Sequence, residues 1–121
     1  TSFELIFKDL SLVCRKCILF RGIICNTEFA IGDVLPCGVK AMAAYGHTPG
    51  HTIYRTDDKL IVGDIMHGLA LQMEHPDFCA RFDMDHEKAI ASRKAVLEQV
   101  NKEGWTIFGM HFPTGEGVKV E

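Results

Sequence analysis

The stretch YGHTPGHTIYRTDDKLIVGD, residues 45–64, decides how the rest of the chain is interpreted. It opens with a loop rich in Gly and Pro that carries His47 and His51. Residues 52–56 alternate in polarity, the pair Asp57-Asp58 suits a turn, and residues 59–64 form a second apolar run that stops on Asp64. We therefore predict a β-hairpin over 52–64, with two histidines at the start of one strand and a carboxylate at the end of the next. Such a grouping suggests a metal site.

Length and composition limit the function classes. The chain has 121 residues, 47% of them hydrophobic and 24% charged, which predicts a single domain over 1–121 with a sizeable core. A net charge of −3 and scattered Lys and Arg provide no basic surface, so we expect no nucleic-acid partner. No apolar run approaches the roughly 20 residues that span a bilayer, and the N-terminus lacks the basic start of a signal peptide. We expect no membrane partner and a cytoplasmic location.

The remaining elements follow from periodicity. Residues 1–28 contain two strand-like runs that we do not place in the fold, and short strands are predicted over 39–45, 105–109 and 118–120. Residues 65–82 predict a helical turn and a loop. The clearest element is a helix over about 85–103, with Asp83 or Asp85 as its cap and Gly104 at its end. Its apolar stripe consists of Ala89, Ile90, Val96, Leu97 and Val100. The fold class is thus α/β (α+β), a mixed β-sheet with one long helix.

Three candidate metal ligands lie where predicted strands give way to loops: His51, Asp64 and His111. Their separations are 13 and 47 residues (64 − 51 and 111 − 64), which is too wide for a local motif. Strand ends that meet at one edge of a sheet would bring them together. Imidazole and carboxylate suit zinc, and also iron or manganese. Each residue also has a structural reading: His51 bonding local backbone, Asp64 capping a turn, and His111 as an ordinary loop histidine.

The cysteines offer a competing metal site. Cys14 and Cys17 have the spacing of a zinc knuckle, and Cys25 and Cys37 could complete four thiolates. A zinc ribbon needs a second close pair, and the sequence has none. We therefore interpret these residues, and Cys79, as packed free thiols.

The motifs GHTPGHT, then GD, then GMHFP, resemble those of metallo-β-lactamase fold hydrolases. The run from Gly63 to Pro113 is similar, more narrowly, to the subgroup of methyl parathion hydrolase and lactonase-like enzymes. The resemblance covers residues 34–121. It implies the C-terminal half of an αββα sandwich, and hydrolysis of an ester, lactone or phosphotriester by metal-bound hydroxide.

The resemblance also implies residue roles. His51 is similar to the ligand of the first metal, Asp64 to the carboxylate that bridges both metals, and His111 to a ligand of the second. His47 is expected to shape the loop behind the ligands, and His67 either to line the site or to be a surface or packing histidine. No side chain is expected to act as a nucleophile.

One departure from the family is large. The family's N-terminal half carries a His-x-His-x-Asp-His motif, and this sequence has no histidine before His47. We expect one metal ion per chain, or none, and a homo-oligomer or a complementing N-terminal half that covers the exposed apolar face. Two hypotheses remain open at this point. The first is a partial metal-dependent hydrolase acting on a small-molecule substrate. The second is a truncated or diverged, catalytically inactive half-domain that acts only through self-association or a partner chain.

Overall fold

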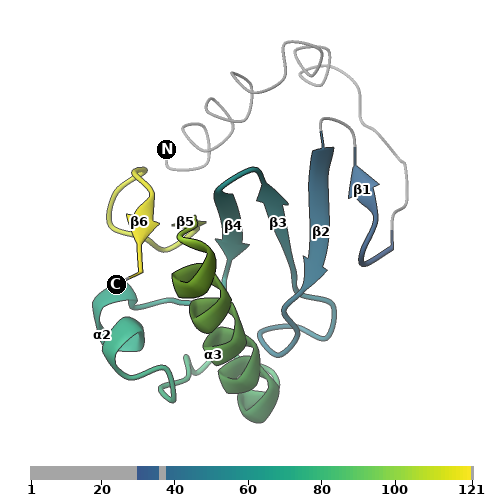
Figure 1. Ribbon diagram of the computed structural model, residues 1–121. Coiled ribbons are helices and arrows are strands. Elements are labelled where there is room, and N and C mark those ends of the chain that lie inside the picture. Colours follow the sequence, from purple (N-terminus) through teal and green to yellow (C-terminus); the bar gives the residue numbers. More distant parts are fainter. Residues whose placement is uncertain (1–29, 36–37, 121) are drawn as a thin grey trace.

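The computed structural model describes residues 30–35 and 38–120. A six-stranded sheet, ordered β1-β2-β3-β4-β5-β6, is covered on one face by a long helix (Figure 1). The elements are β1 (Val34–Leu35), β2 (Val39–Ala43), β3 (Thr52–Thr56), β4 (Lys59–Gly63), α2 (Leu69–Glu74), α3 (His86–Glu103), β5 (Thr106–Gly109) and β6 (Val118–Lys119). The predicted strands within 1–28, and residues 14, 17, 25 and 37 of the alternative cysteine zinc site, lie outside the described residues.

The hairpin predicted over 52–64 is confirmed. β3 and β4 pair antiparallel, with Thr56 opposite Lys59, which leaves Asp57 and Asp58 as the turn. Asp57 has a φ of 49°, a left-handed conformation that Asp tolerates in tight turns. The turn fixes the register, and the register places Gly63 and Asp64 at the same end of the sheet as the start of β3.

The sheet is mixed, as predicted. All neighbouring strands run antiparallel except β4 and β5, which are parallel and need a crossover connection. α2 and α3 lie within that crossover, and α3 packs across the sheet (Figure 1). Because β4 and β5 run in the same direction, both carboxyl ends reach one edge of the sheet, where Asp64 and His111 follow them.

The helix predicted over about 85–103 is also confirmed, with its caps. The Asp85 side chain accepts the Lys88 N–H at 3.1 Å, and Gly104 ends the helix with a φ of 68°. The buried positions of α3 are Ala89, Arg93, Val96 and Val100. The arginine is the surprise, because it occupies a stripe position that the sequence pattern reserves for apolar side chains.

The core lies between α3 and the centre of the sheet. Ile53, Leu60, Val62 and Ile107 are at most 1% exposed and pack with Val100 of the helix. Close packing of these strands against α3 gives the loops beyond the strand ends a rigid base. None of the helices in 30–35 and 38–120 is long and apolar enough to cross a bilayer.

Candidate metal centre

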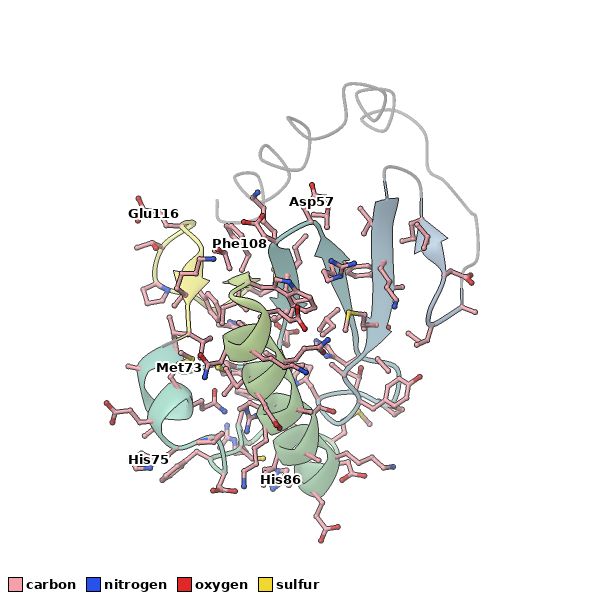
Figure 2. All side chains as sticks on the ribbon, viewed as in Figure 1. Asp57, Met73, His75, His86, Phe108 and Glu116 are labelled. Atoms are coloured by element: carbon pink, nitrogen blue, oxygen red, sulfur yellow. The ribbon has the colours of Figure 1, made fainter. Side chains whose placement is uncertain are left out.

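The site forms at the edge of the sheet where β4 and β5 end and β3 begins. In Figure 2 this edge lies toward the bottom of the view, where His86 marks the start of α3. Asp57 of the hairpin turn lies at the top. The N–H of Met110 donates to the Gly63 carbonyl at 3.1 Å, which continues the β4–β5 pairing past the strands. His111 is thereby brought beside Asp64.

The GHTPGH loop, residues 46–51, is held against α3 by a close backbone contact. Gly46 has a φ of 134°, and a Cβ there would lie 2.1 Å from the backbone nitrogen of Ala89. Only glycine accepts both the conformation and the contact. Two backbone hydrogen bonds, Asp85 N–H to the Gly46 carbonyl and Met84 N–H to the His47 carbonyl, complete the junction. The His47 side chain is therefore placed by the helix start as well as by its own loop.

Asp64 lies between two histidines. Its Oδ1 is 3.0 Å from His111 Nε2, and its Oδ2 is 3.4 Å from His47 Nε2. Each carboxylate oxygen thus faces a different imidazole. The Asp64 side chain is 35% exposed, so the carboxylate is open to solvent and to a ligand.

His67 completes the group. Its ring stacks on His111 at a centroid distance of 4.6 Å and lies 4.9 Å from His47. Burial, then the nearby His111 and His47, lower the pKa of His67, which favours the neutral form of its ring. Its Nδ1 is buried and has no hydrogen-bond partner among residues 30–35 and 38–120. A buried ring nitrogen left without a partner is costly unless something at the site engages it.

These donor atoms converge closely enough for a metal ion. Asp64, His67 and His111 each offer one ligand atom, all within 4.8 Å of one another, and His47, His67 and Asp83 form a second such group. Neutral imidazoles with a carboxylate are a donor set that zinc, iron and manganese accept. The orphaned His67 Nδ1 and the open carboxylate of Asp64 fit a metal ion.

His51 lies beside this group with both ring nitrogens engaged. Its Nδ1 is 2.9 Å from the Ala44 carbonyl, and its Nε2 accepts the backbone N–H of Asp64 at 3.1 Å. Burial lowers the pKa of His51, consistent with a neutral ring. Gly63 permits this arrangement, because a Cβ there would lie 3.0 Å from His51 Nε2. The ligand role expected for His51 stays a prediction. In this structure His51 Nε2 accepts the Asp64 N–H and so holds the Asp64 backbone.

Three residues of the site had no functional role in the sequence analysis. Asp83, considered there only as a helix cap, is buried and lies 2.9 Å from His47 Nδ1. Arg93 donates to three backbone carbonyls, those of Ile65, Pro76 and Phe78. Gln72 accepts the N–H groups of His67 and Gly68 with its side-chain oxygen. A charged residue within an apolar helical stripe was the one sequence signal that could have identified Arg93.

Known structures identify the fold. One match is AidC, a dizinc quorum-quenching lactonase in complex with a product, N-hexnoyl-L-homoserine, at 29% identity and a TM-score of 0.65. Another is the hydrolase AbOPH of the β-lactamase superfamily, at 32% identity and a TM-score of 0.68. The fold is that of a metallo-β-lactamase half. No family model matches the sequence, and a search of curated proteins finds no match.

The likeness is to hydrolases, and it is partial in length. AidC is matched over 70% of this chain and 30% of its own, and AbOPH over 75% of this chain and 32% of its own. This chain therefore spans about a third of the length of these proteins. The metallo-β-lactamase superfamily is supported, while the narrower lactonase-like subgroup remains a prediction.

Proposed function

We propose that this chain forms one side of the metal centre of a hydrolase that cleaves an ester, lactone or phosphotriester bond in a small molecule. The observation that carries the proposal is the Asp64 carboxylate between His47 and His111, with the unpartnered Nδ1 of His67 beside it. The likeness to two hydrolases of this fold supports the class of reaction.

The ligand set follows from the hydrogen bonds. Asp64, His67 and His111 would hold one ion per chain, because their donor atoms lie within 4.8 Å of one another, and His47, whose Nε2 is 3.4 Å from Asp64 Oδ2, would be a further ligand. His51 would hold the Asp64 backbone, since its two nitrogens already serve Ala44 and Asp64. The family resemblance gives the ligand role to His51, and the geometry favours His47.

A bound zinc, iron or manganese ion supplies Lewis acidity to the bond under attack and makes water a better nucleophile near neutral pH. The chain's own residues prepare that chemistry. Asp64 offers one oxygen to each side of the site, which suits a carboxylate shared between two positions. The lowered pKa of His67, caused mainly by burial, favours a neutral ring that does not oppose a cation.

The rim of the site suits a substrate with an apolar group. Phe82 is 66% exposed, and its ring lies 6.0 Å from that of His67. Met110, directly before His111, is 41% exposed. An acyl chain or aromatic leaving group lying against these side chains would be desolvated next to the donor cluster.

Association is a second candidate function, without catalysis. Ala41, Tyr54, Ile61 and Phe108 are register partners across β2 to β5 on one face of the sheet. None of them belongs to the core cluster under α3. We propose that a second copy of this chain, or a chain that carries the complementary half, packs on this face, where Tyr54 and Ile61 are half-buried and Ala41 and Phe108 are buried.

Metal content tests the proposal first. Purified protein would be analysed for zinc, iron and manganese beside Asp64→Asn, with Asp58→Asn as the matched control because the Asp58 side chain is 66% exposed and pairs with Lys59 at the far end of the hairpin. The proposal expects about one ion per chain in the wild type and the control, lost in Asp64→Asn, and metal-dependent hydrolysis of an ester, a lactone or a phosphotriester. Absence of metal, or equal metal in Asp64→Asn, would refute it. Metal without hydrolysis in any oligomeric form would favour the second candidate.

A further inference from the structure

A buried charge pair lies directly behind His47. The Asp83 side chain is 0% exposed and that of Arg93 1%, and Arg93 Nη2 is 3.5 Å from Asp83 Oδ2. The other guanidinium nitrogens donate to the carbonyl of Ile65, which follows β4, and to those of Pro76 and Phe78, which follow α2. An ion pair without solvent survives only when its polar atoms are satisfied, and here they are. This pair therefore has a defined geometry.

The two oxygens of Asp83 have different partners. Oδ2 accepts the backbone N–H of Ala80 at 3.1 Å and faces Arg93, whereas Oδ1 faces His47 Nδ1 at 2.9 Å. The buried guanidinium of Arg93 beside Oδ2 and the Ala80 N–H that donates to the same oxygen both favour the ionised carboxylate. The carboxylate is thus acceptor-only, and His47 must donate to it from Nδ1.

A ligand role for Asp83 itself does not fit this arrangement. Both oxygens are engaged, the side chain has no solvent access, and Arg93 lies beside it. A cation placed there would displace the His47 bond and face the guanidinium. The carboxylate is better suited to hold the imidazole than to hold a metal.

We propose that Asp83, fixed by Arg93, is the positioning residue of His47. By accepting Nδ1–H it selects the tautomer whose Nε2 lone pair faces Asp64 and the donor cluster. Imidazole ligands are commonly held this way by a carboxylate, which orients the ring and raises its basicity. The functional part of this inference rests on the proposed metal centre, whereas the tautomer itself does not.

The tautomer is measurable without metal. Long-range ¹H–¹⁵N correlation spectra of metal-free protein at about pH 8.5, above the usual imidazole titration, distinguish a protonated Nδ1 from a protonated Nε2. We expect Nδ1–H for His47 in the wild type, because its 2.9 Å contact to Asp83 is shorter than its 3.4 Å contact to Asp64. An Nε2–H tautomer in the wild type would overturn the proposal without any variant.

Asp83→Asn should reverse the tautomer. The amide oxygen is required at the Oδ2 position, where the Ala80 N–H and Arg93 both donate, so the amide nitrogen would face His47. His47 Nδ1 would then become an acceptor and Nε2 would carry the proton. We expect zinc affinity to fall about 10- to 100-fold.

The matched control is Asp85→Asn, on the same segment but 43% exposed and bonded to Lys88. It should leave both the His47 tautomer and zinc affinity unchanged. Wild-type tautomer in Asp83→Asn, or an equal loss of zinc affinity in Asp85→Asn, contradicts the proposal. If the wild type binds no metal, the proposed function fails, and the tautomer comparison still decides the role of Asp83.

Discussion

Matched asparagine substitutions at His47 and His51 separate the ligand from its support. Asn places a donor nitrogen near the position of imidazole Nδ1 and has nothing at Nε2. His47→Asn can therefore keep its bond to Asp83, and His51→Asn its bond to the Ala44 carbonyl. Each variant removes only the Nε2 function, which for His47 faces Asp64 and for His51 accepts the Asp64 N–H.

The two variants should differ from the wild type in different measurements, His51→Asn in stability and His47→Asn in zinc affinity. His51→Asn leaves the partly buried Asp64 N–H without its acceptor, which costs about 1–3 kcal/mol of unfolding free energy. That shifts the urea midpoint by about 1–2 M for a chain of this size. His47→Asn loses no structural hydrogen bond, so its metal-free stability should change by less than about 1 kcal/mol. Its zinc affinity should instead fall by more than about 100-fold, since a lost ligand exceeds a lost outer partner.

Urea unfolding of metal-free protein and zinc titration by competition with a chelator would be run on the same three preparations. In His51→Asn we expect zinc affinity within about 10-fold of the wild type. The reverse pattern refutes the reasoning: zinc binding lost in His51→Asn with unchanged stability, and kept in His47→Asn. That outcome would return the ligand role to His51, as the family resemblance implies.

Other variants test the supports of the site. Arg93→Met removes the positive charge beside the buried Asp83 carboxylate and the side-chain donor to the Ile65 and Pro76 carbonyls, and should cost about 3–5 kcal/mol in urea unfolding. Exposed Lys94→Met should change the unfolding free energy by less than about 1 kcal/mol. Gly46→Ala should abolish folding or lower the unfolding free energy by more than about 3 kcal/mol. Gly32→Ala, also at positive φ but with open space around it, should lower it by about 1–2 kcal/mol. Equal losses in the two variants would contradict the close contact of Gly46 with α3. Because the folded-state pKa of His51 is depressed, its contribution to stability is present above about pH 6.5 and is lost as pH falls through the folded value. His51→Gln should therefore flatten the stability profile between about pH 7 and 5, and an unchanged slope would exclude His51 as its source.

The fold was largely predictable because its elements have local causes. The hairpin turn, the apolar runs of β4 and β5, and the caps of α3 are each determined by neighbouring residues. The mixed sheet follows once α3 lies between β4 and β5. Arg93 was missed because its burial depends on carbonyls of residues 65–78, and no helical periodicity encodes such distant partners.

The site was predictable in place but not in detail. That Asp64 and His111 meet follows from strands ending at one edge. Which histidine of the GHTPGH loop faces Asp64 depends on the backbone angles of Gly46 and on the space left by Gly63. Those are properties of the folded loop. The sequence pattern identifies two candidate imidazoles, His47 and His51. The backbone of the loop between them decides that both ring nitrogens of His51 form hydrogen bonds within the protein.

Three of the four donor groups, Asp64, His47 and His67, are held by a hydrogen bond from another residue. His51 bonds the Asp64 backbone, Asp83 bonds His47, and the Gln72 side chain holds the His67 backbone. These supports are protein–protein hydrogen bonds, so the donors adopt their positions without a ligand to gather them. A metal ion would then bind an arrangement whose ordering cost was met during folding, which favours affinity. It would also stabilise the fold only by mass action, so the unfolding midpoint should rise with the logarithm of zinc concentration above Kd. A cooperative folding transition that requires zinc would show instead that the ion assembles the site, and the supports described here would then be a consequence of binding.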